Sequence, residues 1–220
     1  MKKQKIFLSL WISFFTLFIS VLLYAFVFHP NLRSKGADEN VFLMEKVKSG
    51  GLAGYGSYEI SFDKLTFEAA KFLNLRFNAM QTMYADNFGL KLNIDNMDKF
   101  KKRMSSADSI DVFSGFMLNV DSGLVRSRMV SAVEMKGFTL EINIDGRKRF
   151  LVATNKLLMR RGKPVRMAAT VISDVQTGRT LGTLGCSFDK GFSKIKFNDS
   201  VYLMTGDKKE SVDMKELVLF

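Results

Sequence analysis

The sequence predicts an α+β protein, in which one N-terminal transmembrane helix precedes helices packed on a curved antiparallel sheet of four to five strands. Three observations lead to this fold class. The run Ile6–Phe28 holds 23 residues without a charge. Between residues 63 and 118, apolar side chains recur every three to four positions, and from residue 122 onward they alternate with polar ones.

The uncharged run is long enough to cross a membrane. A hydrocarbon core of about 30 Å requires about 20 apolar residues at about 1.5 Å each. The alternative is a cleaved signal peptide, whose apolar region spans about 7–15 residues before small residues, but this run ends in aromatic residues. Lys2, Lys3 and Lys5 place a tail of residues 1–5 in the cytoplasm. We therefore expect a single-pass protein of the bacterial inner membrane, with residues 6–28 in the membrane and the C-terminal domain in the periplasm.

The chain beyond the predicted span divides into three parts. Residues 29–58 are rich in glycine and polar residues without periodicity, which predicts a flexible periplasmic arm. Residues 59–190 carry the periodic segments and form the predicted periplasmic α+β domain. Residues 191–220 are a C-terminal extension, with strand signals at Lys194–Phe197 and Val201–Met204.

Three helices are predicted in the first half of the domain. Asp63 can cap the free N–H groups of the first helix, and the apolar residues that follow fall mainly on one face. The helices cover about Asp63–Tyr84, Asn93–Met104 and Ser109–Leu118.

Strands are predicted in the second half. Residues 138–144 alternate between apolar and polar, as in a half-buried strand. Asp145-Gly146 is typical of a hairpin turn, and Pro164 is placed at a strand start, where its missing N–H does no harm. The other predicted strands are Leu124–Met135, Arg149–Met159, Val165–Ser173 and Thr180–Phe188.

The composition argues against most catalytic and metal sites. With one cysteine, Cys186, and one histidine, His29, the chain has no intramolecular disulfide and lacks the residues of a zinc site or a Ser–His–Asp triad. Cys186 is expected to be buried as a small apolar side chain, or paired with another chain. No phosphate-binding loop motif is present. We predict no enzyme activity, no cofactor, and no catalytic, cofactor-binding or metal-binding residue.

Other chemically suggestive residues have ordinary structural interpretations. The methionines are expected to fill the core, or to line an adaptable groove for a partner. The neighbouring carboxylates fit a helix surface, and the dispersed glycines fit turns and strands rather than a phosphate cradle. These residues are Asp108, Asp111 and Asp121, and Gly178, Gly182 and Gly185.

The chain is strongly basic, with a formal net charge of +11. Basic runs stand at Lys99–Arg103, Arg147–Arg149 and Arg160–Lys163. Aromatic residues do not interleave with these runs as a groove for single-stranded nucleic acid requires. We therefore expect a solvated face or a docking patch for an acidic partner, and no direct nucleic-acid binding.

Two segments carry a resemblance to a known family. Phe67–Asn78 reads FEAAKFLNLRFN and looks like a long first helix, and Asn155–Val165, continuing to Gly185, is similar to a set of closing strands. In these segments the chain resembles the TraE-type inner-membrane proteins of conjugative type IV secretion systems, whose periplasmic domain has the nuclear-transport-factor-2-like fold. The Asn-Pro-x-Gly turn of many secretion-channel relatives is absent, because the only prolines are Pro30 and Pro164.

The resemblance implies a cone-shaped periplasmic domain and a structural function. The protein would be an assembly subunit of an envelope-spanning secretion channel used in conjugation. It would act through periplasmic protein–protein contacts with itself, as a homo-oligomer, and with other channel subunits.

A sensory function is the alternative. Asp174-Val-Gln-Thr-Gly178, with Gly182 four residues further on, resembles the D-x-x-T-G-x-x-x-G phrase of periplasmic Cache or PAS-like sensor domains. Such a domain would need a separate partner to transmit its signal, because no output module follows it in this sequence.

Overall fold

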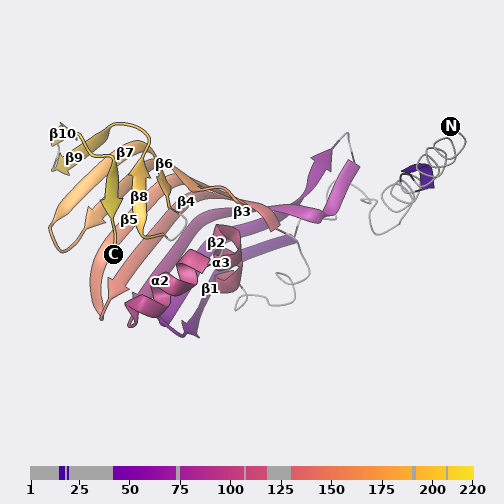
Figure 1. Cartoon of the computed structure of the whole chain (residues 1–220), viewed down its shortest axis with the longest axis horizontal. Coiled ribbons are helices and arrows are strands. Elements are labelled where there is room, and N and C mark those ends of the chain that lie inside the picture. The colour runs from indigo at the N-terminus through magenta and orange to yellow at the C-terminus, as the bar shows by residue number, and fades with distance from the viewer. Residues whose placement is uncertain are drawn as a thin grey trace, which may run out of the picture.

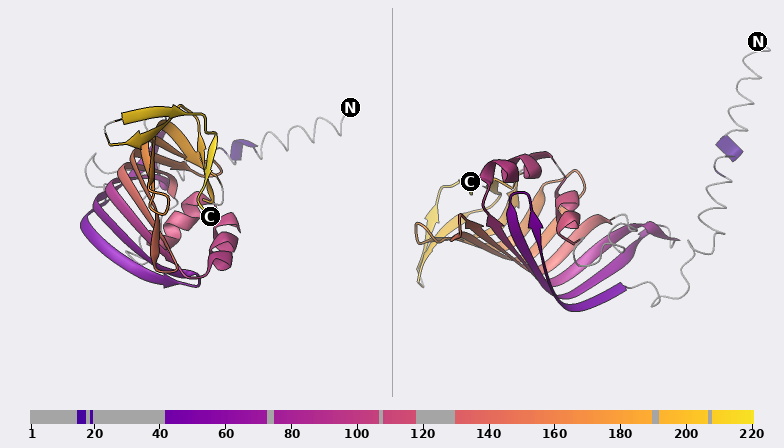
Figure 2. Two further views of the ribbon diagram at one scale, coloured as in Figure 1. Left: turned by 90° about the vertical axis from the view of Figure 1, so that its left-hand side faces the viewer. Right: turned by 90° about the horizontal axis from the view of Figure 1, so that it is seen from below.

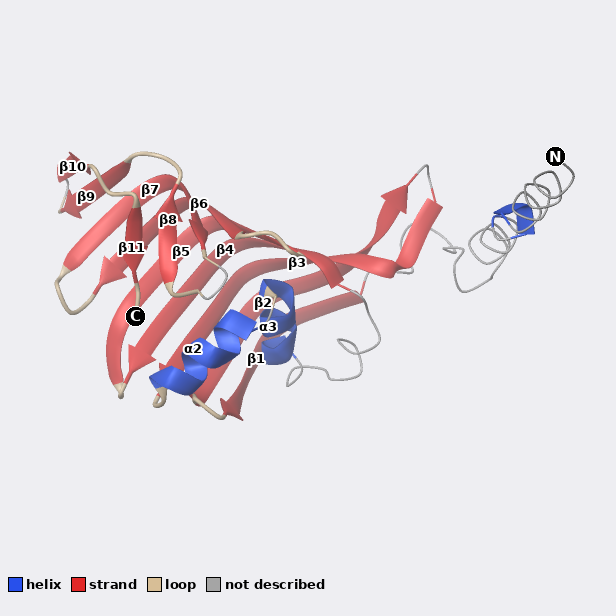
Figure 3. Ribbon diagram, viewed as in Figure 1, coloured by secondary structure: helices blue, strands red, loops and turns tan. Residues whose placement is uncertain are grey.

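The structure is a computed structural model that describes residues 15–17, 19, 42–72, 75–106, 108–117, 130–189, 192–206 and 208–220. Within these residues, an eleven-stranded sheet curves into an open trough with two helices on its concave side (Figures 1, 2 and 3). The helices are α2 (Met97–Ser106) and α3 (Ser109–Met117). The strands are β1 (Phe42–Ala53), β2 (Gly56–Phe72), β3 (Leu75–Ile94), β4 (Val130–Ile144), β5 (Arg147–Arg160), β6 (Val165–Asp174), β7 (Arg179–Phe188), β8 (Lys194–Phe197), β9 (Val201–Thr205), β10 (Lys208–Val212) and β11 (Glu216–Val218).

The strand order explains where the helices lie. Neighbours follow the order β1-β2-β3-β4-β5-β6-β7-β8-β11, while β9 pairs with β7 and with β10. Every pair is antiparallel except β3 and β4, which are parallel. Parallel neighbours need a crossover connection over one face of the sheet. Helices α2 and α3 belong to this connection, which carries them across the concave face.

This architecture corrects the predicted fold class. The α+β, nuclear-transport-factor-2-like fold with helices on four to five strands is wrong, because strands dominate and the sheet has eleven of them. The predicted first helix, Asp63–Tyr84, is divided between β2 and β3. Residues 42–53, expected in a flexible arm, form the edge strand β1.

The predicted transmembrane helix, residues 6–28, lies outside the described residues except for positions 15–17 and 19. The cytoplasmic tail, residues 1–5, and the first part of the arm also lie outside them. In the part of the chain that is described, no helix combines the length and the apolar character needed to span a membrane.

The second half of the chain follows the prediction closely. The predicted second and third helices correspond to α2 and α3, in which Phe100, Met104, Ile110, Phe113 and Met117 are buried and Met97 is half-buried. The predicted strands in 149–188 are β5, β6 and β7, and both strand signals of the extension are β8 and β9. The predicted strands at 124–135 and 138–144 are a single strand, β4, described from Val130.

Strand β4 is continuous but bent, and the bend extends across seven strands of the sheet. Four residues in four different strands have positive φ angles: Lys46 (51°), Asn87 (51°), Gly137 (67°) and Ala169 (52°). The strand register on both sides of these residues shows which residues of neighbouring strands lie opposite one another. It places one residue from each of seven strands in a single line. We call this line the crease, and it consists of Lys46, Asp63, Asn87, Gly137, Asn155, Ala169 and Leu184. The long strands bend partway along their length in Figure 2.

The crease changes which side chains face the core. Side chains normally alternate between the two faces of a strand. At the crease, two consecutive residues face outward, so the buried residues that flank them are three positions apart. This spacing recurs in six strands, at Phe62/Leu65, Ala85/Phe88, Met135/Phe138, Thr154/Leu157, Met167/Thr170 and Thr183/Cys186, all of which are buried.

One row of side chains stabilises the concave side of the crease. Phe62, Phe88 and Phe138 stack across β2, β3 and β4, with ring centroids 6.0 and 6.2 Å apart. The row continues into β5 and β6 with threonines, where the Thr154 hydroxyl donates to the Ala168 carbonyl at 2.7 Å and the Thr170 hydroxyl donates to Thr154 Oγ1 at 3.2 Å. At the bend, the Thr154 hydroxyl thus supplies a donor to the Ala168 carbonyl, and the Thr170 hydroxyl in turn has Thr154 as its acceptor.

Replacing Gly137 by alanine tests the crease. The new Cβ would lie 2.5 Å from Asn87 Oδ1, and Gly137 has a φ of 67°, which L residues rarely adopt. We expect Gly137→Ala to lower the free energy of unfolding by about 2–3 kcal/mol, measured by urea denaturation.

The matched control is Gly146→Ala in the β4–β5 turn. Gly146 has a similar φ of 71°, but a Cβ there meets nothing within 4 Å. We expect this variant to lose only about 1 kcal/mol from backbone strain. Equal losses in the two variants would show that the close packing of Asn87 on Gly137 contributes nothing.

Candidate binding cavity

Helix α2 begins where the β1–β2 turn meets the end of β3. The backbone carbonyl of Tyr55 accepts hydrogen bonds from the N–H groups of Asp95 and Asn96, at 2.9 and 3.1 Å. The Asn96 side chain then caps the helix by accepting a bond from the Lys99 N–H at 3.0 Å. The Tyr55 ring packs edge-on against Phe100, with centroids 5.2 Å apart, which fixes the start of α2 over the sheet.

Burial changes the acidity of Tyr55. Removal of the phenol from water is the main cause that raises the pKa of Tyr55 to about 12, and the neighbouring Tyr58 adds to it. The charge of Arg103 acts in the opposite direction.

Helix α3 is fixed at its N-terminal end by Asp108. One carboxylate oxygen accepts a bond from the Ile110 N–H at 3.0 Å, and the other accepts one from the Gly162 N–H in the β5–β6 turn at 2.7 Å. Asp111 forms an ion pair with Arg161 of the same turn at 3.0 Å. Both partners of this pair are half exposed, so it stabilises the contact by about 1 kcal/mol at most.

The rest of α3 packs on the aromatic row of the crease. Phe113 contacts Phe88 with centroids 5.1 Å apart, and Phe116 lies edge-on to Tyr58 at 4.9 Å. On the other side of the trough, the C-terminal Phe220 meets Phe100 of α2 at 5.1 Å. The two helices and the C-terminal end of the chain therefore cover the concave face together.

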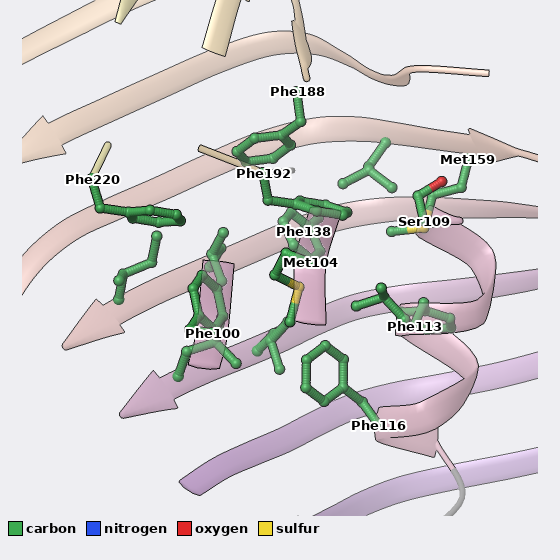
Figure 4. Close-up of a pocket in the computed structure, with 16 residues that line it drawn as sticks. Phe100, Met104, Ser109, Phe113, Phe116, Phe138, Met159, Phe188, Phe192 and Phe220 are labelled. Carbon is green, nitrogen blue, oxygen red and sulfur yellow. The ribbon is translucent and has the colours of Figure 1, made fainter. Parts of the chain in front are cut away.

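A cavity remains between the sheet and this cover (Figure 4). Its volume is about 40 Å³, and its walls are apolar apart from one serine. Sheet residues, both helices and the C-terminal segment all contribute. The lining residues are Leu90, Leu92, Phe100, Met104, Ser109, Val112, Phe113, Phe116, Phe138, Leu140, Ile142, Leu157, Met159, Phe188, Phe192 and Phe220.

A second, polar hollow lies at the N-terminal end of α3. Its volume is about 260 Å³. Ser109 lines both spaces, and its hydroxyl is buried without a hydrogen-bond partner in the structure. We call this space the α3 hollow, and it is lined by Ser105, Ser106, Asp108, Ser109, Gly162, Lys163, Pro164, Val165 and Asp189.

The structure also shows where the cysteine, the carboxylates and the glycines singled out in the sequence lie. Cys186 is a free thiol in the core, 1% exposed, and burial raises its pKa. Asp108 and Asp111 bind the β5–β6 turn, whereas Asp121 lies outside the described residues. Gly178 lies in a turn at a positive φ, and Gly182 and Gly185 lie within β7. Among the described residues, no group of three or more potential metal ligands comes together.

The methionines and the basic runs also have defined places. Met83, Met104, Met117 and Met135 are buried, and Met104 also lines the cavity. Met97 is half-buried, and the side chains of Met80 and Met129 lie outside the described part of the chain. The cations of the run Lys99–Arg103 are exposed on α2. Most of the other two basic runs are exposed in or beside turns.

The cavity itself was not predicted. Its walls come from segments that are up to 130 residues apart in sequence, between Leu90 and Phe220. The one local signal was the apolar C-terminal segment Met214–Phe220, in which Leu219 is buried.

No protein-family description matches the sequence, and no curated protein matches it significantly.

The raised pKa of Tyr55 predicts a loss of stability at alkaline pH. The folded state holds the phenolic proton more tightly than the unfolded state, whose pKa is about 10. This contribution to stability is therefore complete below about pH 10 and is lost as the pH rises toward 12.

The matched comparison is Tyr55→Phe, which keeps the ring but does not titrate. We expect the free energy of unfolding of the natural chain to fall more steeply than that of the variant between about pH 9 and about pH 11, measured by urea denaturation at each pH. Parallel pH profiles would contradict the assignment.

Proposed function

We propose that this protein is a non-catalytic binding module that holds the apolar chain of a ligand, of the acyl-chain type, between its concave sheet and α2–α3. The observation that carries the proposal is the cavity of Figure 4, which is lined by sixteen residues with a single polar side chain. Each methylene group of an acyl chain that moves from water into such a lining gains about 0.8 kcal/mol. The lining has only one polar side chain, so almost no polar group of the protein loses water when the chain binds.

The cavity must widen to accept a chain. Its 40 Å³ is well below the roughly 150 Å³ of an engineered apolar cavity that binds benzene. Two features favour widening. Met104 and Met159 line the cavity, and methionine side chains repack readily. The polar contacts that hold α3 to the β5–β6 turn are few and partly exposed.

The cavity can be tested with a photoreactive probe. We expect an acyl methyl ester with a diazirine at the end of its chain to label cavity residues of the full chain in phosphatidylcholine vesicles. Val112→Phe, which fills the cavity from α3, should reduce this labelling about tenfold, because inserting volume into a packed core costs about 1–3 kcal/mol. Mass-spectrometric mapping of labelled peptides provides the measurement.

Two further variants make this experiment decisive. Val175→Phe adds the same side chain at a position in the β6–β7 turn that is 48% exposed, and it should leave labelling unchanged. Met104→Ala enlarges the cavity, so it should increase labelling while lowering the stability of the unliganded protein by about 2–5 kcal/mol. Labelling spread over the outer surface, or equal in all variants, would refute the proposal.

Assembly with other protein chains is a second candidate function, supported by the edge of β1. In the described part of the chain, β1 has no strand partner other than β2, so it is an edge strand of the sheet. Leu43 and Leu52 on this strand are 48% and 90% exposed. An edge strand with exposed apolar residues favours the addition of a strand from a partner.

This second candidate keeps the expected contacts of the protein with itself and with other subunits. The secretion-channel expectation gains no support from the fold, because Phe67–Asn78, compared with a long first helix, belongs to β2 and β3. Anchoring by residues 6–28 and a periplasmic location remain predictions from the sequence.

Cysteine cross-linking tests assembly through β1. If two copies pair antiparallel through this strand, Leu43→Cys on one copy should form a disulfide with Leu52→Cys on the other when the two variants are mixed in membranes and oxidised. The native Cys186 does not interfere, since it is buried. Leu184→Cys, 72% exposed on the outer side of the crease, is the control. Cross-linking no stronger than in this control would exclude self-pairing through β1.

A further inference from the structure

We propose that the ligand of the cavity is a single-chain amphiphile with an uncharged, hydroxylated head, of the monoacylglycerol class, whose head lies in the α3 hollow. This inference rests on the proposed binding of an apolar chain and names the part of the ligand that would lie outside the apolar cavity. It follows from a lining residue that the two spaces share, from the unpartnered hydroxyl of that residue, and from the charges around the hollow.

Ser109 is the residue that the two spaces share. It lines the apolar cavity and the α3 hollow, and its hydroxyl is the only side-chain oxygen or nitrogen in the cavity lining. This hydroxyl is buried and makes no hydrogen bond in the structure. Buried polar atoms are normally paired, so an oxygen of a head group at this boundary would supply the missing partner. Figure 4 shows Ser109 beside Met159, with Phe100 and Phe220 toward the other end of the lining residues.

The size of the α3 hollow fits a small head group. Its 260 Å³ equals the share of about eight or nine water molecules in the liquid. That is enough for a three-carbon polyol, and Ser105 and Ser106 add two further hydroxyls to the walls.

The charges around the hollow favour a neutral head over an anion. Lys163 is the one cationic side chain among the lining residues, whereas Asp108 and Asp189 both bring a carboxylate. These carboxylates already accept bonds from Gly162 N–H at 2.7 Å and from Lys194 N–H at 3.0 Å. They are therefore fixed in place as negative charges, and they would repel a carboxylate or phosphate head.

Lys163 argues against a cationic head in the hollow. Asp108 accepts a second bond from Ile110 N–H, and Asp189 accepts a second bond from the Ser193 hydroxyl at 2.7 Å, so each carboxylate still has lone pairs for a hydroxyl donor. An ammonium group would also lie in the same hollow as Lys163, which makes no ion pair among the described residues. A hydroxyl can both donate to these oxygens and accept from Ser109.

The test compares three probes that share one diazirine-bearing chain: a monoacylglycerol, the free fatty acid and the primary amine. The full chain is reconstituted in phosphatidylcholine vesicles at about pH 8, where the free acid is ionised. The labelling of cavity residues measured in Val112→Phe is subtracted from that of the natural chain. This subtraction removes labelling by probe molecules that lie in the bilayer and not in the cavity. We expect the monoacylglycerol to label at least about fivefold more than the acid or the amine, an energy difference of about 1 kcal/mol.

Two variants locate the head group. Ser109→Ala should reduce monoacylglycerol labelling about threefold to fivefold without lowering the melting temperature, because it removes a hydroxyl that has no partner. Ser114→Ala, on the same helix but lining neither space, should leave labelling unchanged. Asp189→Asn keeps an acceptor but removes a negative charge, so it should raise labelling by the free acid.

The outcomes separate this inference from the proposed function. Equal labelling of the cavity by all three probes, or stronger labelling by the acid or the amine, would overturn the head-group assignment and leave the apolar site intact. Unchanged monoacylglycerol labelling in Ser109→Ala would also overturn it. If no probe labels the cavity above the Val112→Phe level, both the inference and the proposed function fail.

Discussion

The crease is the constraint on which the rest of this structure depends. Seven strands bend at the same line, and each therefore presents two consecutive residues outward and restarts its inward row one position later. A bend in one strand alone would break its ladder with both neighbours, so the bend has to be shared. The phenylalanine row at Phe62, Phe88 and Phe138 and the hydroxyls of Thr154 and Thr170 make the shared bend stable on its concave side.

The crease also explains why the apolar pattern of residues 63–84 was misleading. Phe62 and Leu65 are three positions apart because of the bend, and that spacing imitates one turn of a helix. Asp63 between them resembles a helix cap, yet its carboxylate accepts a bond from Asn87 Nδ2 at 2.7 Å across the crease. The residues that follow, rich in Ala, Leu, Lys and Met, have high helix propensity, and pairing with β1 and β4 overrides it.

The later strands were predictable because turns divide them into short segments. Asp145-Gly146, Arg161-Gly162-Lys163 and Thr177-Gly178 all mark turns in the structure, and the alternation between them is local. The cavity was not predictable in the same way. Met159, Phe188 and Phe220 become neighbours only when the sheet curves and the chain end returns to α2, and no local pattern encodes that encounter.

The incomplete filling of the trough follows from how its cover is attached. Helix α3 is placed by the crossover between β3 and β4 and by the contact of Phe113 with Phe88, while the C-terminal segment arrives from the opposite side of the sheet, through β11. These two covers are positioned independently, and Phe220 contacts Phe100 of α2. The cavity lies beneath both covers, and the flexible side chains of Met104 and Met159 are part of its lining. A cavity of this origin lies where α3 and the C-terminal segment can separate without breaking the sheet. A chain-shaped ligand would enter between these two segments.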